Sequence, residues 1–179
     1  DGDHRQNIRK NHTATHLMHQ ALKLILGDHV QQAGSLVHPD YLRFDLTHFE
    51  KLTSDQIREI ETMVNREILL NNALDISVKN FDEAKKQGAV AMFGEKYGDE
   101  VRVVTVANFS MELCGGTHVE RTGDIGLFKI TEESSLASGV RRIVAVTGPK
   151  AVEHIQKQAA ALGNIQNQLN SGMEQVSER

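Results

Sequence analysis

The stretch Asn11-His12-Thr13-Ala14-Thr15-His16-Leu17 decides how the chain is organised. The apolar pattern around it predicts a helix from about residue 5 to residue 26, which ends at Gly27. Because residues four apart share one helix face, His12 and His16 point into the same space and can hold one metal ion. The alternative is a pair of hydrogen-bonded core histidines, since this spacing also occurs by chance.

A second pair of metal-binding side chains follows in the stretch Cys114-Gly115-Gly116-Thr117-His118. Cys114 is the only cysteine in the chain, so it cannot form an internal disulfide and is available for a metal or for chemistry. Together the two stretches offer one sulfur and three nitrogens, which suits zinc. We therefore expect a zinc site made by His12, His16, Cys114 and His118.

Two further interpretations concern the same side chains. Cys114 could act as a nucleophile paired with a histidine, but three histidines near one thiol favour a metal cage. His19, in the next helical turn, is offset from the other two histidines and is interpreted as structural or solvated.

Length and composition restrict the class of protein. A chain of 179 residues is long enough for one domain, with room for a small appendage. The net charge of -4 argues against broad electrostatic binding of nucleic acid, so any such contact must be local. The sequence contains neither a membrane-length apolar run nor a secretory segment, and we expect a soluble, cytoplasmic protein. Because it begins at Asp1, we expect it to be part of a longer polypeptide.

The remaining pattern predicts an α+β fold with helices on one side of a mostly antiparallel sheet. A capping box at residues 53–56 opens a second helix, and residues 81–87 form a short third one. The predicted strands cover residues 30–37, 42–46, 74–78, 101–107, 109–113, 125–131 and 140–147, with a further apolar run at 90–93. The zinc site is expected between the first helix and the turn at Cys114.

Polar residues on two predicted strands are candidates for ligand contacts. Gln32, Gly34 and Ser35 share the first strand, where a glycine often marks a close backbone approach; a solvent-facing strand edge is the alternative. Alternation makes Arg141 and Arg142 face opposite sides of the last strand. One could reach a phosphate or carboxylate, or both could form surface ion pairs.

The last part of the chain predicts a long helix from Pro149, with apolar residues at heptad spacing from residue 152 to residue 176. We expect residues 1–148 to form the zinc-containing domain. Residues 149–179 would begin a linker or coiled coil of the longer parent, with a helix partner for residues 150–176.

The paired motifs His-Thr-Ala-Thr-His and Cys-Gly-Gly-Thr-His resemble the editing domain of alanyl-tRNA synthetases and the free-standing alanyl-tRNA deacylases. The resemblance spans nearly the whole chain. Its further stretches are residues 34–37, 42–45, 93–98 and 139–143. Threonyl-tRNA synthetases carry a similar domain with Gly-Pro before the last histidine, where this chain has Gly116-Thr117. This difference favours the alanyl type.

The resemblance implies hydrolytic proofreading: cleavage of the ester in seryl- or glycyl-tRNA(Ala), within an alanine-tRNA ligase that uses ATP elsewhere in the parent chain. The class II aminoacylation motifs are absent from this sequence. The implied partners are the acceptor end of tRNA(Ala) and the remaining domains of the synthetase. The implied zinc ligands are His12, His16, Cys114 and His118; the implied substrate-side residues are Thr15, Gln32, Ser35 and Arg141.

The chemistry of this implied reaction leaves choices open. Thr15 is the natural discriminator between serine and alanine, because a site that needs the serine hydroxyl rejects alanine. Four protein ligands complete a tetrahedral zinc site and leave no open position for water. The histidine motif also lacks the glutamate that serves as general base in His-Glu-x-x-His metalloproteases. Zinc could polarise the ester, orient the substrate, or activate a water placed by Gln32 or Ser35. Alternatives are a non-catalytic, zinc-stapled tRNA-binding module, a free-standing deacylase, and a threonyl-type editing domain.

Overall fold

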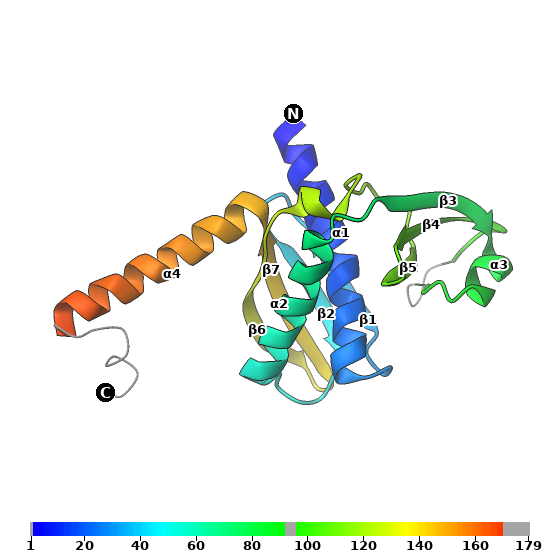
Figure 1. Cartoon of the computed structure of the whole chain (residues 1–179). Coiled ribbons are helices and arrows are strands. Elements are labelled where there is room, and N and C mark those ends of the chain that lie inside the picture. Colours follow the sequence, from blue (N-terminus) through cyan, green and yellow to red (C-terminus); the bar gives the residue numbers. More distant parts are fainter. Residues whose placement is uncertain (1, 92–95, 170–179) are drawn as a thin grey trace.

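The chain folds as an α+β protein with two antiparallel sheets, according to the computed structural model, which describes residues 2–91 and 96–169. The four-stranded sheet has the order β1-β2-β7-β6, and the three-stranded sheet has the order β3-β4-β5. The helices are α1 (Gly2–Leu26), α2 (Ser54–Leu69), α3 (Phe81–Lys86) and α4 (Gly148–Leu169), with a 3-10 turn η1 (Thr122–Ile125). The strands are β1 (Gln32–Val37), β2 (Leu42–Thr47), β3 (Leu74–Asn80), β4 (Glu100–Val106), β5 (Ser110–Leu113), β6 (Phe128–Ala137) and β7 (Val140–Thr147). Figure 1 shows α1 and α2 side by side over the larger sheet.

Helix α1 lies at the centre of the molecule. It contacts α2, both sheets and η1, so its middle third is buried on nearly every side. Apolar residues such as Leu17 and Leu22 pack against Phe44 of β2 and Ile143 of β7 in the main core. The polar residues Asn11, Thr13, Thr15, His16 and His19 are buried on the same helix. The buried surface is therefore wider than the stripe that the sequence predicts.

The smaller sheet forms an arm with its own apolar cluster (Figure 1). Val101 and Val103 of β4 and Leu113 of β5 pack with Ala84 of α3. The sequence predicts one sheet, and this is wrong: β4 pairs only with β3 and β5, whereas β7 pairs with β2 and β6. Each group of strands has its own apolar cluster, which explains the separation.

Most predicted boundaries agree with the structure. The capping box is confirmed: the side chain of Thr53 accepts from the Gln56 backbone, and the side chain of Gln56 accepts from the Thr53 backbone. The predicted strand at 125–131 begins instead at Phe128, because Ile125 belongs to η1 and Gly126 follows with a φ of 78°. Residues 92–95 lie outside the described residues, and with them part of the apolar run at 90–93 and of the matching stretch at 93–98.

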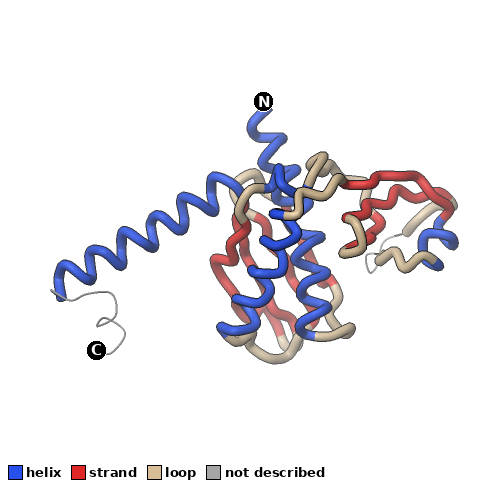
Figure 2. The backbone as a smooth tube through the Cα atoms, in the orientation of Figure 1, coloured by secondary structure: helices blue, strands red, loops and turns tan. Residues whose placement is uncertain are grey.

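Helix α4 projects away from the larger sheet, as Figures 1 and 2 show. Its apolar side chains remain exposed: Val152, Ile155, Leu162, Ile165 and Leu169 have exposed fractions between 39% and 45%. The predicted heptad positions at 173 and 176 lie outside the described residues. The role of this helix as a linker or coiled coil stays a prediction.

Within residues 2–91 and 96–169, no helix combines the length and the apolar character needed to cross a membrane.

Candidate metal centre

Four side chains from two distant segments meet at one end of the smaller sheet. His12 and His16 come from α1; Cys114 and His118 come from the turn after β5. Their possible ligand atoms all lie within 4.8 Å of one another, and the cluster is the one group of this kind in the described part of the chain. The Sγ atom of Cys114 lies 3.4 Å from Nε2 of His12 and 3.4 Å from Nε2 of His118. The convergence predicted from the two motifs is confirmed.

The chemistry of this donor set fits a metal ion such as zinc. Burial raises the pKa of the Cys114 thiol, but the three neighbouring histidines, His118 first, outweigh it and lower the pKa to about 3. Cys114 is therefore a thiolate, the form that binds metals. Nε2 of His16 is buried and has no hydrogen-bond partner among the described residues. Nε2 of His19 is likewise buried without such a partner, so it is the position of His16 beside three other possible ligands that favours a metal ion there.

Glu112 supports the cluster from behind. This buried carboxylate on β5 accepts hydrogen bonds from Nδ1 of His16 and, at 2.9 Å, from Nδ1 of His19. Burial alone would raise the pKa of Glu112, yet His16 and His19 lower it to about 2. Burial likewise lowers the pKa of His16, but Glu112 overcomes this and raises it to about 10. Because Glu112 occupies Nδ1 of His16, Nε2 is the nitrogen left for a metal ion, which would displace the proton from it.

His19 is structural, one of the two roles expected for it. Sequence reasoning missed Glu112, although its position carried a signal: on a strand, residues two apart face the same side, so Glu112 and Cys114 point toward the same helix.

Arg102 holds the turn after Cys114 in place by donating hydrogen bonds to two of its backbone carbonyl groups. Nη1 of Arg102 on β4 donates to the carbonyl oxygens of Cys114 (2.8 Å) and Gly116 (2.6 Å). A Cβ atom at Gly116 would overlap the imidazole of His12, whereas one at Gly115 would meet no atom within 4 Å. The glycine at 116 is thus required by the close approach of the turn to α1.

A cavity of about 340 Å³ opens beside the cluster and contains three of the predicted substrate-side residues, Thr15, Gln32 and Ser35. The hydroxyl of Thr15 donates to the carbonyl oxygen of Asn11 at 2.8 Å, so its oxygen can still accept a hydrogen bond from a ligand. Oε1 of Gln32 is buried and has no partner within the described part of the chain. These residues line a cavity next to the predicted metal ligands, and Gln32 and Ser35 lie on β1, which is an edge strand of the larger sheet.

The two arginines of β7 face opposite sides, as alternation predicts. Arg141 pairs with Glu133 at 2.5 Å, and Arg142 forms a two-pronged pair with Asp45 at 2.7 and 2.9 Å. Arg141 does not line the cavity beside the cluster. Its predicted role in substrate binding stays a prediction.

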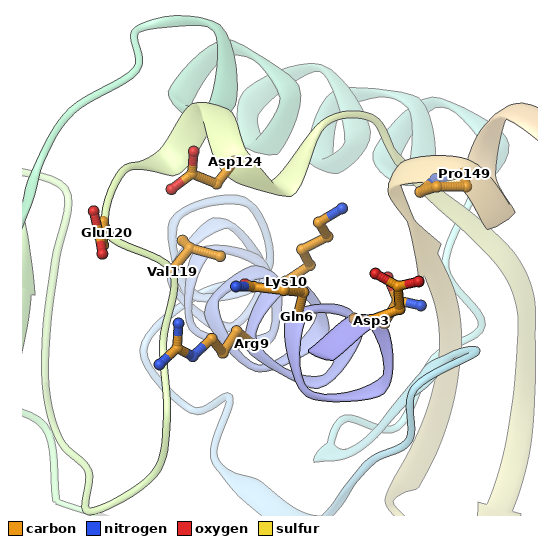
Figure 3. Close-up of a pocket in the computed structure, with 9 residues that line it drawn as sticks. Asp3, Gln6, Arg9, Lys10, Val119, Glu120, Asp124 and Pro149 are labelled. Atoms are coloured by element: carbon orange, nitrogen blue, oxygen red, sulfur yellow. The ribbon is translucent and has the colours of Figure 1, made fainter. Parts of the chain in front are cut away.

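A second cavity, of about 740 Å³, lies between the first turns of α1 and the segment around η1 (Figure 3). Three acidic residues and two basic ones line it, namely Asp3, Glu120, Asp124, Arg9 and Lys10. None of the four predicted metal ligands lies in it. Its mixed charge favours neither an anion nor a cation.

Comparison with known proteins gives one family match and many relatives. Residues 101–144 match the family described as "Threonyl and Alanyl tRNA synthetase second additional domain". The chain is 57% identical to an alanine–tRNA ligase of Myxococcus xanthus, over all of this chain and 20% of that protein. It is 56% identical to the enzyme of Pseudoalteromonas translucida, over 92% of this chain and 19% of that protein. The chain thus spans about one fifth of the length of these relatives.

Proposed function

We propose that this chain, which matches the second additional domain at residues 101–144 and is similar to about one fifth of alanine–tRNA ligases, is an editing hydrolase. Its reaction is the cleavage of the ester that joins serine or glycine to tRNA(Ala). The observation that carries the proposal is the cavity in which Thr15, Gln32 and Ser35 adjoin the His12, His16 and Cys114 side chains.

The cavity accounts for a preference for serine over alanine. The Thr15 proton is committed to the Asn11 carbonyl, so the Thr15 oxygen is an acceptor for the serine hydroxyl. Oε1 of Gln32 is a second buried acceptor that lacks a partner within the described residues. An alanyl group has no hydroxyl to offer either oxygen, and buried polar atoms left unpaired oppose its binding. A glycyl group lacks the hydroxyl too, so this contact accounts for cleavage of the seryl ester and not of the glycyl ester.

The metal is zinc, held by His12, His16, Cys114 and His118. When bound, zinc supplies a Lewis acid that polarises an ester carbonyl or activates a water. The chain's own residues position the substrate: Gln32 and Ser35 line the cavity where a water or the aminoacyl group would be placed. Glu112 does not serve as the general base, because both of its oxygens are engaged by His16 and His19.

The partners follow from the substrate and from the length of the relatives. The cavity receives the acceptor end of tRNA(Ala), and the remaining parts of the parent synthetase, including its ATP-using ligase centre, lie outside this chain.

Residues 1–148 form the editing domain. Residues 149–179 lead toward a linker or coiled coil, with a helix partner for residues 150–176. The location is cytoplasmic.

The second candidate is a non-catalytic, zinc-stapled module that binds tRNA. It is favoured by the number of ligands, since four protein side chains complete a tetrahedral zinc site and leave no open position for water. Two further candidates use similar motifs. A threonyl-type editing domain would be distinguished by the tRNA on which it acts, and a free-standing deacylase by the length of the native chain.

Hydrolysis time courses test the proposal. The zinc-loaded chain is incubated with seryl-tRNA(Ala) and, separately, with alanyl-tRNA(Ala) and seryl-tRNA(Thr). We expect rapid loss of the first ester only. Equal hydrolysis of the seryl and alanyl esters of tRNA(Ala) would contradict the proposed discrimination, and cleavage of the tRNA(Thr) ester alone would indicate the threonyl type.

A further inference from the structure

Thr13 is a fully buried residue of α1 that contacts the turn carrying Cys114 and His118. Its hydroxyl oxygen lies 3.0 Å from the carbonyl oxygen of Arg9, 3.2 Å from the backbone nitrogen of Val119, and 3.2 Å from Nδ1 of His118. One hydroxyl therefore joins the first helix to the end of the turn, more than a hundred residues later in the sequence.

The hydrogens of these three contacts can be assigned by counting. A hydroxyl has one proton to donate and two lone pairs that accept. The Arg9 carbonyl can only accept, so it takes the Thr13 proton. The Val119 N–H can only donate, so it uses one lone pair. The remaining lone pair faces Nδ1 of His118, which must then be the donor.

This assignment fixes the form of the His118 ring. A neutral imidazole carries one proton, and if that proton is on Nδ1 then Nε2 has a free lone pair. Nε2 is the ring atom that lies 3.4 Å from the Cys114 sulfur, on the side of the predicted metal ligands. The same arrangement holds His16, whose Nδ1 donates to Glu112. Histidine ligands of metals characteristically donate their second nitrogen to such a partner.

We propose that Thr13 is a positioning residue of the metal centre: its hydroxyl keeps His118 in the Nδ1–H form and holds the Cys114–His118 turn against α1. The inference rests on the metal centre of the proposed function, and does not depend on which ester is cleaved. Glu112 reaches from the smaller sheet to a helix histidine, and Thr13 reaches from the helix to a turn histidine. The two halves of the site thus support each other.

The test is a Thr13→Val substitution, which keeps the size of the side chain and removes the hydroxyl. Zinc affinity is measured by competition with a chromogenic chelator. We expect the affinity to fall about 10–100-fold. Thr13→Ser, which retains the hydroxyl, should bind zinc within about threefold of the wild type.

Thr122→Val is the matched control. Thr122 is also fully buried, and its hydroxyl also donates to one backbone carbonyl (Glu67, 2.8 Å) and accepts from one backbone nitrogen (Asn72, 2.9 Å), but it contacts no predicted metal ligand. We expect unchanged zinc affinity for this variant. An equal loss in both valine variants would overturn the inference, because the effect would then be that of any buried hydroxyl. Unchanged affinity in Thr13→Val would overturn it as well.

A second measurement needs no variant. The ¹H–¹⁵N spectrum of the histidine rings in the zinc-loaded wild-type chain reports which nitrogen of His118 carries hydrogen. We expect a protonated Nδ1; a protonated Nε2 would overturn the inference even if Thr13→Val does not fold. Both readouts are made without tRNA, so failure of ester hydrolysis and failure of this inference are separate results.

Discussion

Gly116 lies so close to the ring of His12 that a Cβ atom at residue 116 would overlap the imidazole, although the two residues are far apart in the sequence. Gly116→Ala must therefore push the ring or the turn away from the ligand position. We expect zinc affinity to fall about 10–100-fold, as for other overpacked sites. Chelator competition measures the change.

Gly115→Ala is the control for that substitution, since its added methyl group meets no atom within 4 Å. It should bind zinc like the wild type. If the two alanine variants have the same affinity, the close packing of turn against helix does not matter for the metal.

Glu112→Gln removes the charge that holds His16 and His19 while keeping the side chain's size. An amide has one accepting oxygen, and its NH₂ group would face a ring N–H, so one buried donor loses its partner. We expect the free energy of unfolding to fall by about 1–3 kcal/mol and zinc affinity to fall about 10–100-fold. Urea unfolding and chelator competition measure the two effects.

Glu61→Gln is the matched control, because Glu61 also accepts from two donors, Lys129 and the Ile130 backbone, at the β6 edge of the larger sheet. It should lose stability and keep its zinc affinity. An unaltered metal affinity in Glu112→Gln would show that the carboxylate has no part in the site.

Helix α1 and the ligand set could be predicted from the sequence because local periodicity and short spacings determine them. The histidines four apart and the Cys114 turn are local patterns, and they are found together as expected. The pairing of strands depends on residues far apart in the sequence. No local sequence pattern around β4 predicts that β6 and β7 join a different sheet. Glu112 and Thr13 were missed for the same reason, since each acts on a histidine about a hundred residues away.

Removal of the metal should leave the fold largely intact. The main core joins α1, α2 and the larger sheet through residues such as Leu17, Phe44 and Val64, none of which contributes to the cluster. We expect the far-UV circular dichroism to persist after chelation, while the melting temperature falls because a bound ligand stabilises the folded state. Complete unfolding on chelation would instead support the zinc-stapled module.

Thr15→Val tests the discriminating hydroxyl. The variant removes the acceptor for the serine hydroxyl, and we expect hydrolysis of seryl-tRNA(Ala) to slow about 10–100-fold. Thr62→Val is the control: its hydroxyl also donates to the carbonyl four residues earlier, that of Arg58 (2.7 Å), but it lies on α2 away from the cluster cavity. Equal rates in the two variants would mean that Thr15 does not contact the substrate.

The most direct test of the account is hydrolysis of seryl-tRNA(Ala) by the zinc-loaded chain and by its Cys114→Ala variant, with folding of both checked by circular dichroism. Cys114 is the thiolate of the cluster and lines the cavity where the ester would lie. We expect rapid loss of the ester with the wild type and only the spontaneous rate with the variant. Equal hydrolysis by both proteins, or none by a folded and zinc-loaded wild type, would contradict a metal-dependent editing site in this chain.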